Sequence, residues 1–582
     1  MKVFLNENKV AIQLYSGDDF QSIIQKIKDN LSPYEYSPQT KLWTTEKMNL
    51  LVFQQIFNNE KIYYGEGVLQ LLEKQKQYLE QLEVDKNIPY NDQILLLKNE
   101  NLKLFDHQKK AINYLLKYPS SGLFDEQGLG KTLTVISVLC ILFDQKKIDN
   151  VIIFCPNTLK FNWARELELF SSLTFCVLHG DRKERLQQLA ETKQIYITNY
   201  ESLAIKKTKV KEKTKAQKTA EEFQDSFTNL ITSRTSIILD EAHRIKSGNS
   251  KISKYIRKIG KLAEYKYTLT GTPIANKPED IFYLMMFLDD GKLLGTNYWQ
   301  FLKQYCILGN HFSEYAIVGY KNLDKLKFLI NLKSLRRLKD DVLDLPEKIY
   351  EEKIIEPTRE HLMFYNKLKA EVLQIITKEG DLKRIEPYLI RLIQASSNPL
   401  LIDPETKIVG SKVSELDNLL TEHIELSGNK VVVWTNFVNN YPYLLERYKK
   451  YNPVYINGSV DPKARQDCVE QFQTNPEVKL IICNPQAAKE GITLTASSVS
   501  IYLDRTFNLV DWKQSNDRIH RIGQNKRCLI ITLLCKDSID EIISKNIYKK
   551  SEIAAFLQGD IDSIQKIDNK AMIRECIKQL ML

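Results

Sequence analysis

The chain has 582 residues, of which 43% are hydrophobic and 27% are charged. This balance is that of a globular protein, and at about 150 residues per domain the length predicts three or four domains. A disordered or collagen-like chain is excluded, and so is a membrane protein, because the longest apolar run, residues 134–143, is far shorter than the ~20 residues that span a bilayer. The net charge of +10 is mild for this size and hints at a polyanionic partner without establishing one.

The first residues and the cysteines bear on the compartment. The chain begins Met-Lys-Val-Phe-Leu-Asn-Glu-Asn, without the apolar core of a signal peptide. Its nine cysteines include no C-x-x-C pair, which favours reduced thiols. We therefore expect a protein that is not secreted: cytoplasmic or at the nucleoid in a prokaryote or virus, and nuclear in a eukaryote.

Two blocks of alternating elements follow a leader of about 100 residues. In the first block, short apolar runs that predict strands occur at residues 122–124, 151–155, 175–178, 195–198, 236–239 and 266–270. In the second block, such runs occur at residues 431–434, 453–456, 480–483, 499–503 and 529–534. Helical stretches separate the runs, so each block predicts a parallel sheet with helices on both faces. Residues from about 290 to 410 read as mostly helical and charged, and a helical tail is expected after residue 537.

A glycine-rich turn follows the first of these runs, reading Asp-Glu-Gln-Gly-Leu-Gly-Lys-Thr from Asp125 onward. Gly128 and Gly130 would let backbone amides approach a polyphosphate at the positive end of a helix. Lys131 would neutralise phosphates, and the hydroxyl of Thr132 would ligate Mg²⁺. The strict phosphate-loop pattern needs glycine where this chain has Asp125, so the turn is a weak signal when taken alone.

Paired carboxylates end another apolar run, where residues 236–243 read Ser-Ile-Ile-Leu-Asp-Glu-Ala-His. Asp240 at the end of the strand can hold Mg²⁺ through water, and Glu241 can orient and deprotonate an attacking water. Acids at a strand end beside a phosphate loop are what ATP hydrolysis needs. The two segments together therefore predict a site for MgATP.

Two arginines lie three positions apart in the second block, where residues 514–524 read Gln-Ser-Asn-Asp-Arg-Ile-His-Arg-Ile-Gly-Gln. Arg518 and Arg521 are expected to project from one face of a helix. Two guanidinium groups can stabilise the charge on a transferring γ-phosphoryl group. Two arginines on a helix are usually a solvated surface, so the complete segment carries the prediction.

In this order the segments resemble the motifs of SWI/SNF-type proteins, a branch of the superfamily-two helicase-like ATPases. The usual motif I of this branch has Asp at position 125, Asp-Glu-Ala-His resembles motif II, and residues 514–524 resemble motif VI. Six further segments resemble other motifs of the branch. They are residues 105–108 (the Gln segment), 155–163 (motif Ia), 198–201 (motif Ic), 269–274 (motif III), 431–437 (motif IV) and 488–495 (motif V). Residues 336–342 resemble part of the helical insertion peculiar to this branch. The chain departs from the family at Phe507, where the family often has Trp-Asn-Pro.

The resemblance implies an α/β fold of two RecA-like domains with helical protrusions between them. The expected domains are an accessory domain at 1–100, RecA-like domains at 101–289 and 411–545, a helical protrusion region at 290–410 and a helical tail at 546–582. It implies a monomeric DNA-dependent ATPase that uses ATP and Mg²⁺ to translocate along double-stranded or branched DNA, with protein partners left unknown.

The resemblance also assigns roles to residues. It implies catalysis by Glu241, Arg518, Arg521 and Lys131, with the arginines completing the ATP site from the second domain. The Mg²⁺ ligands would be Thr132 and Asp240. The implied nucleotide contacts are Gln108, Asp125, Glu126, Gln127, Gly128, Leu129, Gly130, Lys131, Thr132, Asp240, Gly491 and Gln514. The implied DNA contacts are Pro156, Asn157, Asn199, Tyr200, Thr435, Asn436, Thr493 and Trp512.

The leader has a shorter match, in which residues 36–43 read Tyr-Ser-Pro-Gln-Thr-Lys-Leu-Trp. This resembles the core of the module that precedes the motor in HepA-related (HARP) annealing helicases and engages branched DNA there. The alternative is a small capping domain in which Trp43 belongs to the core. The first interpretation favours an annealing or fork-remodelling translocase in DNA repair. A motor that displaces proteins from DNA and a non-hydrolysing DNA-binding scaffold stay open as alternatives.

Overall fold

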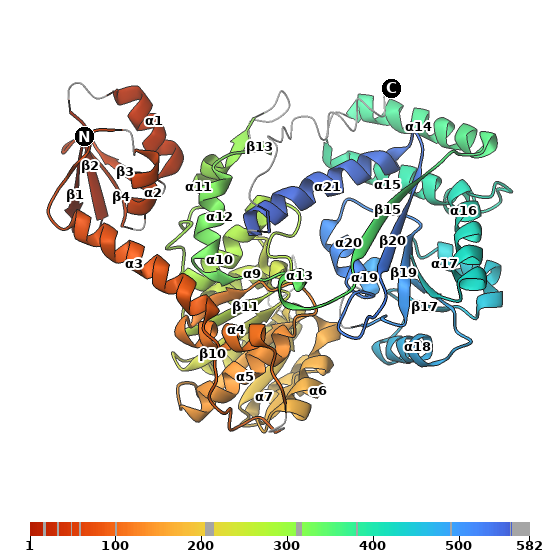
Figure 1. Ribbon diagram of the computed structural model, residues 1–582, viewed down its shortest axis with the longest axis horizontal. Coiled ribbons are helices and arrows are strands. Elements are labelled where there is room, and N and C mark those ends of the chain that lie inside the picture. The colour runs from red at the N-terminus through yellow and green to blue at the C-terminus, as the bar shows by residue number, and fades with distance from the viewer. Residues whose placement is uncertain are drawn as a thin grey trace. The chain divides into compact units, whose positions relative to one another are not determined.

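The computed structural model describes residues 1–7, 9–15, 19–31, 34–47, 49–57, 60–98, 102–203, 215–309, 317–379, 382–488, 492–558 and 560–561. This part of the chain forms two compact units (Figure 1). The first unit comprises Met1–Leu338 and the described residues from Ile553 onward, and the second comprises Lys339–Glu552. The helix α21 (Ile539–Gln558) starts in the second unit, and its last residues belong to the first.

The first unit begins with a small mixed sheet of order β3-β4-β2-β1-β5. Its strands are β1 (Lys2–Asn6), β2 (Lys9–Gln13), β3 (Tyr34–Ser37), β4 (Leu42–Glu46) and β5 (Tyr63–Tyr64). The helices α1 (Phe20–Asn30) and α2 (Asn49–Ile56) share one apolar core with the sheet, and Trp43 is buried in that core. The long helix α3 (Val68–Asn87) then runs to α4 (Asp106–Lys117), where the buried carboxylate of Asp85 accepts hydrogen bonds from Lys117 and Tyr118.

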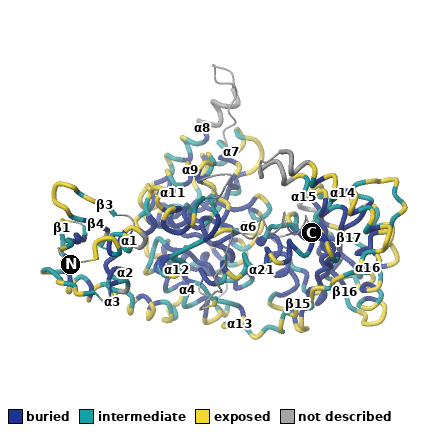
Figure 2. The backbone as a smooth tube through the Cα atoms, turned by 90° about the horizontal axis from the view of Figure 1, so that it is seen from above, coloured by how far each residue is buried: buried dark blue, intermediate teal, exposed yellow. Residues whose placement is uncertain are grey.

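A seven-stranded, fully parallel sheet forms the centre of the first unit, in the order β14-β6-β11-β10-β7-β9-β8. The strands are β6 (Ser120–Leu123), β7 (Asn150–Cys155), β8 (Phe175–Val177), β9 (Ile195–Asn199), β10 (Thr235–Asp240), β11 (Tyr265–Leu269) and β14 (Ser334–Leu335). The helices of this part are α4, α5 (Lys131–Asp144), α6 (Lys160–Phe170), α7 (Arg182–Ala190), α8 (Lys215–Asn229), α9 (Lys251–Gly260), α10 (Phe282–Asp289), α11 (Tyr298–Tyr305) and α12 (Leu323–Asn331). The central strands are almost entirely buried, as continuous apolar runs predict for strands covered on both faces (Figure 2).

The second unit contains a six-stranded parallel sheet of order β15-β20-β19-β16-β18-β17. Its strands are β15 (Lys348–Ile355), β16 (Lys430–Trp434), β17 (Val454–Ile456), β18 (Leu480–Cys483), β19 (Ser497–Tyr502) and β20 (Cys528–Cys535). Its helices are α13 (Lys339–Val342), α14 (Arg359–Glu379), α15 (Leu382–Ser397), α16 (Ser411–Leu420), α17 (Asn440–Arg447), α18 (Pro462–Thr474), α19 (Pro485–Ala488), α20 (Leu509–Asn516) and most of α21. The core combines the apolar faces of the central strands with those of α16 and α17.

The predicted α/β fold with two parallel sheets is confirmed, and every strand predicted from an apolar run is present. The stretch expected to be mostly helical also contains strands. These are the hairpin of β12 (Cys306–Leu308) and β13 (Ile317–Tyr320), and one edge strand of each large sheet. The edge strands gave no apolar signal, because β14 has two residues and β15 is exposed along most of its length. The predicted domain boundaries stay predictions, and residues 562–582 of the expected tail lie outside the described residues.

No helix in the described ranges is both long enough and apolar enough to span a bilayer.

Candidate active site

The glycine-rich loop connects β6 to α5 in the first unit. Gly128 and Gly130 have φ angles of 91° and 74°, in the left-handed region that favours glycine. A Cβ atom on Gly130 would lie 2.4 Å from Nε2 of Gln108, so a side chain here would displace the Gln108 amide from its hydrogen bonds. The loop therefore exposes backbone at Gly128 and Gly130 directly before the N-terminus of a 14-residue helix, an arrangement that suits a polyphosphate.

Lys131 is the first residue of α5, and its ammonium group points back into the loop. Its Nζ donates hydrogen bonds to the carbonyl oxygens of Asp125 at 2.7 Å and Glu126 at 3.1 Å. Burial lowers the pKa of Lys131, and the negative charges of Glu241 and Asp240 oppose that shift. The predicted phosphate-binding lysine therefore lies in the electrostatic reach of both predicted acids.

Asp240 ends β10, and its carboxylate is held on two sides. The indole Nε1 of Trp163 donates to one carboxylate oxygen at 2.8 Å, and the backbone N–H of Glu241 donates to the other at 2.9 Å. Burial and the adjacent charge of Glu241 raise the pKa of Asp240 to about 7. Burial and the charge of Asp240 likewise raise the pKa of Glu166 to about 7. The site concentrates more negative charge than its surroundings stabilise, which a divalent cation would relieve.

Glu241 is 9% exposed and has a φ of 49°, so its backbone is held in a strained conformation at the strand end. Nε2 of Gln127 donates to its carboxylate at 3.3 Å, and Nδ1 of His243 lies 3.3 Å from its other oxygen. The side chain of Gln127 also passes close to Gly271, where a Cβ atom would meet its Cγ at 2.9 Å. The sequence predicted Gln127 as a nucleotide contact, whereas its side-chain amide holds the predicted base.

The side chains of Asp125 and Gln108 hold the phosphate loop in place from within the first unit. The carboxylate of Asp125 is buried and forms a two-pronged ion pair with Arg337, with Nε at 3.1 Å from Oδ1. Gln108 accepts from the N–H of Phe105 at 3.0 Å and donates to the carbonyl of Gly130 at 3.4 Å. The side chains of Asp125 and Gln108 thus shape the loop. Glu126, Leu129 and Thr132 complete the loop and the first turn of α5, and of these only Leu129 is fully buried.

The two predicted arginines lie in the second unit, and the prediction that they share a helix is wrong. The helix α20 ends at Asn516, and Arg518 and Arg521 follow in a turn. The turn tightens because the N–H of Arg518 bonds to the carbonyl of Ser515, three residues back, at 3.0 Å. Asp517 is the first residue beyond α20, and its buried carboxylate is paired with Lys339 and Lys348, which holds the chain in place where the helix ends.

Backbone and hydroxyl oxygens orient both guanidinium groups. Arg518 is 2% exposed and donates to the carbonyls of Gln514 at 2.9 Å and Ile492 at 3.2 Å. Arg521 is half-buried and donates to the hydroxyl of Thr493 at 2.9 Å. Gln514, predicted as a nucleotide contact, is fully buried in α20. Gly491 lies outside the described residues.

The predicted DNA contacts of the first unit differ in exposure. Asn157 is exposed at the start of a short 3₁₀ turn, whereas Pro156, Asn199 and Tyr200 are buried. The hydroxyl of Tyr200 donates to the carbonyl of Asp240 at 2.7 Å, so this side chain supports the acid pair. Only Asn157 of this set presents its side chain to solvent.

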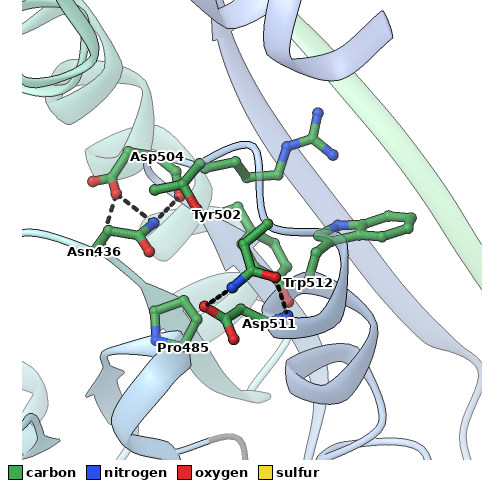
Figure 3. Close-up of a pocket in the computed structure, with 9 residues that line it drawn as sticks. Asn436, Pro485, Tyr502, Asp504, Asp511 and Trp512 are labelled. Carbon is green, nitrogen blue, oxygen red and sulfur yellow. Dashed lines mark hydrogen bonds between the residues drawn. The ribbon is translucent and has the colours of Figure 1, made fainter. Parts of the chain in front are cut away.

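In the second unit, three of the predicted DNA contacts, Thr435, Asn436 and Trp512, lie around Asp504, which follows β19, whereas Thr493 accepts from Arg521. Its carboxylate accepts hydrogen bonds from the hydroxyl of Thr435 at 2.7 Å and from the backbone N–H of Asn436 at 2.7 Å. A pocket at the carboxyl ends of β16 and β19 is lined by Asn436, Asp504 and Trp512 among others (Figure 3). The buried side chains of Thr435 and Trp512 are parts of this framework, so we do not retain them as direct DNA contacts.

The sequence did not predict several residues that hold the acidic side chains in place. Nothing in the sequence signals that Trp163 holds Asp240, or that Gln127 holds Glu241, because these pairs are 77 and 114 residues apart. Asp504 could have been found, because a carboxylate directly after a buried strand is the signal that singled out Asp240.

The fold and the phosphate loop with its acid pair define the class: an α/β nucleotide-binding protein with two RecA-like parallel-sheet domains. Its family follows from comparison with known sequences. The SNF2-related domain family matches residues 107–400, half of the chain, and the helicase conserved C-terminal domain matches residues 411–523. The chain belongs to the SNF2-related family of ATPases.

Individual relatives are distant. The Bacillus subtilis protein named "Putative ATP-dependent helicase/translocase YwqA" is 27% identical over 77% of this chain and 48% of its own length. The Mus musculus "Chromodomain-helicase-DNA-binding protein 1-like" is 26% identical over 78% of this chain and 50% of its own length. The chain thus spans about half the length of these two curated relatives.

Two further matches cover a larger share of the matched protein's own length. The Caenorhabditis elegans "SWI/SNF-related matrix-associated actin-dependent regulator of chromatin subfamily A-like protein 1 homolog" is 23% identical over 96% of this chain and 76% of its own length. The solved structure "Sulfolobus solfataricus SWI2/SNF2 ATPase core in complex with dsDNA" is 26% identical, covering 82% of this chain and 97% of that chain, with a TM-score of 0.35.

Proposed function

We propose that this protein is an ATP-driven motor that moves along double-stranded DNA. The observation that carries the proposal is the assembly in the first unit of Lys131, Asp240 and Glu241 around a glycine-containing loop at a helix N-terminus. Family membership supports ATP as the nucleotide. Two of the relatives are named as a helicase/translocase and a DNA-binding helicase, which supports DNA as the track.

The residues of the chain have distinct parts in this proposal. The amides of the loop and Lys131 bind the phosphates, while Thr132 and Asp240 hold the Mg²⁺ ion. The bound ion would neutralise charge on the phosphates and on Asp240. Glu241, oriented by Gln127 and His243, takes a proton from the attacking water. Arg518 and Arg521 would stabilise the charge that develops on the transferring γ-phosphoryl group.

The DNA contacts in this proposal are mainly to phosphates and therefore largely independent of sequence. Asn157 in the first unit, and Asn436 with Thr493 in the second, are the retained candidates. Such binding should weaken steeply as salt is raised, because counterions are released from the duplex.

The test is ATP hydrolysis by wild type and Glu241→Gln without nucleic acid and with single-stranded DNA, blunt duplex, forked duplex or RNA. We expect stimulation by duplex or forked DNA that the variant loses while still binding ATP. Stimulation by RNA alone would place the protein among RNA-dependent relatives. Absence of turnover under every condition would favour the non-hydrolysing scaffold.

A narrower candidate is a motor that remodels or anneals branched DNA, rather than one that displaces proteins from DNA. The small N-terminal domain supports it. The segment resembling annealing helicases forms the β3–β4 hairpin, in which Tyr36 and Trp43 are direct cross-strand partners with ring centroids 4.8 Å apart. Trp43 is core, but Tyr36 is 47% exposed at the sheet edge and could stack on an unpaired base.

Tyr36→Ala tests this candidate, and Tyr63→Ala is its matched control. Tyr63 is 56% exposed on β5, the opposite edge strand of the same sheet. We expect Tyr36→Ala to lower stimulation by forked DNA about five- to tenfold, the worth of one base stack, while blunt-duplex stimulation is unchanged. Equal losses on both substrates, or equal effects of the two variants, would favour the capping interpretation.

A further inference from the structure

The boundary between the two units falls at Leu338 and Lys339, within residues 336–342, the segment that resembles part of the helical insertion. We call residues 334–339 the strap. Its first residues form β14 and pair in parallel with β6, so that Leu335 lies beside Leu123. The pairing continues past the strand into the phosphate loop. The N–H of Phe124 donates to Leu335 at 2.8 Å, and the N–H of Glu126 donates to Arg337 at 3.0 Å.

Two arginine side chains of the strap reinforce this pairing. Arg336 donates to the carbonyls of Phe124 at 2.6 Å and Gly271 at 3.2 Å, and Asp560 pairs with its other nitrogens at 2.6 and 2.7 Å. Arg337 pairs with Asp125 through two nitrogens and also donates to the carbonyl of His107. The first half of the strap therefore holds residues 124–126, the start of the phosphate loop, by backbone and side-chain hydrogen bonds.

The last residue of the strap is fixed in the second unit. Nζ of Lys339, whose side chain is 1% exposed, donates to the carboxylate of Asp517 at 2.8 Å and to the carbonyl of His520 at 3.0 Å. The neighbouring charges of Lys339 and Lys348 hold the pKa of Asp517 well below its usual range despite burial. Asp517 immediately precedes Arg518, and its own carbonyl accepts from Nε of Arg521 at 3.2 Å. Lys339 thus holds the turn that orients both predicted arginines.

We propose that Arg337 and Lys339 are positioning residues that couple the phosphate loop to the arginine turn through the strap. Only Leu338 separates an anchor on the loop from an anchor on the turn. An extended residue spans at most about 3.6 Å, so the one residue between the two anchors leaves almost no spare chain length. A displacement of the phosphate loop therefore displaces the arginine turn as well. The coupling rests on the proposed ATPase function, and it assigns a role to residues outside the nucleotide contacts.

The two anchors predict different kinetic defects. Arg337→Met leaves Asp125 buried without its guanidinium partner, so we expect ATP binding at least tenfold weaker, with a matching rise in KM. Arg337→Lys should not rescue it, because one ammonium group cannot span both carboxylate oxygens and the carbonyl of His107. Lys339→Met leaves the loop intact, so ATP binding should stay within twofold while kcat falls at least tenfold.

Matched controls separate positioning from loss of charge. Lys348 lies 2.9 Å from the same oxygen of Asp517 but is not part of the strap, so Lys348→Met should lower kcat much less than Lys339→Met. Arg234 forms a two-pronged pair with Asp149 on the surface of the first unit, so Arg234→Met should leave ATP binding unchanged. Equal effects of Lys339→Met and Lys348→Met on kcat would overturn the assignment of Lys339.

A readout that needs no hydrolysis tests the coupling directly. Binding of a slowly hydrolysed ATP analogue should change backbone hydrogen exchange in peptides covering residues 514–521 of the wild type. Insertion of Gly-Gly between Leu338 and Lys339 keeps both anchors and adds slack. We expect this variant to bind the analogue within twofold of wild type but to lose the exchange change in the turn.

Persistence of the exchange change in the insertion variant would overturn the coupling. The outcome is distinct from failure of the proposed function, which would show as a wild type that transmits the change on binding the analogue yet never hydrolyses ATP. Unchanged melting temperatures of the insertion variant and of the surface control Arg234→Met ensure that the comparison concerns folded protein.

Discussion

The candidate nucleotide site of the first unit and the arginine turn of the second unit handle buried charge in opposite ways. In the first, burial and neighbouring negative charge raise the pKa values of Asp240 and Glu166 to about 7, and burial lowers the pKa of Lys131. In the second, two lysines surround Asp517 and keep its pKa well below the usual range. The first site is electrostatically unsatisfied and the second is satisfied.

The difference follows from what each region is proposed to meet. A site for MgATP needs groups whose charges are completed by a cation and phosphates, so its strain is relieved only when the ligand binds. Arginines that act on a transition state need a fixed orientation before the reaction, because reorganisation would raise the barrier. The carbonyls and the Thr493 hydroxyl that receive Arg518 and Arg521 provide such an orientation.

The largest expected effect tests the fixed orientation of the arginines. Arg521→Ala should lower duplex-stimulated hydrolysis by roughly 10³-fold or more, the worth of an arginine that contacts a transferring phosphoryl group, while DNA binding is retained. Arg527→Ala, an exposed residue of the same unit, is the control. Steady-state ATPase assays and DNA titrations measure both quantities. Hydrolysis by Arg521→Ala within tenfold of wild type would contradict the assigned role.

The second effect tests whether the charge of Asp517 is truly satisfied. Asp517→Asn leaves Lys339 and Lys348 without their shared counter-ion, and removing one partner of a buried pair costs roughly 3 kcal/mol or more of folding free energy. Asp417→Asn breaks a pair with Arg447 whose side chains are 35% and 32% exposed, so it should cost about 1 kcal/mol or less. Denaturant unfolding measures both costs, and similar costs would remove the distinction between a buried and a surface pair.

The third effect tests the strain at Asp240 through its pH dependence. Because its pKa in the folded protein is about 7, above the ordinary value of 3.8, the folded state binds this proton more tightly than the unfolded state. Metal-free wild type should therefore lose stability as pH rises from about 4 to about 7. Asp240→Asn removes this loss, so at pH 8 without metal it should be the more stable protein, by on the order of 1 kcal/mol.

The control and the metal dependence sharpen that prediction. Below pH 4 the variant and the wild type should have equal stability, because the carboxyl group of Asp240 is then protonated in both the folded and the unfolded state. Mg²⁺ with ATP should stabilise wild type at pH 8 more than Asp240→Asn, reversing their order, and chelation should restore it. Unfolding curves with and without Mg²⁺ would contradict the prediction if the difference between the proteins does not change with pH.

The smallest effect concerns the link from the loop to the base. Gln127→Met removes one long hydrogen bond to Glu241, worth about 1 kcal/mol, so kcat should fall about fivefold while KM for ATP is unchanged. Gln145→Met, an exposed glutamine at the end of α5, should leave kcat unchanged. A rise in KM with constant kcat would instead indicate that the Gln127 side chain contacts the nucleotide, as the sequence first suggested.

Local signals made most of the fold predictable. Apolar residues dominate most of the central strands, as in β7, β16 and β20, so composition was sufficient to predict these strands. The exceptions were β14 and β15, whose residues become strands only because a neighbouring strand offers a partner. The helix expected through Arg521 failed for a related reason: it ends at Asn516, and Asp517 beyond it is held by lysines about 170 residues away.

The sequence by itself determined the parallel sheets, the glycine loop and the acid pair at the end of β10, because these depend on residues adjacent in the chain. The tertiary structure alone decided which groups hold them: Trp163 on Asp240, Gln127 on Glu241, Arg337 on Asp125 and Lys339 on Asp517. Each of these contacts joins residues far apart in sequence. Their identity follows from how the strands order and the chain returns, which no local pattern of residue types encodes.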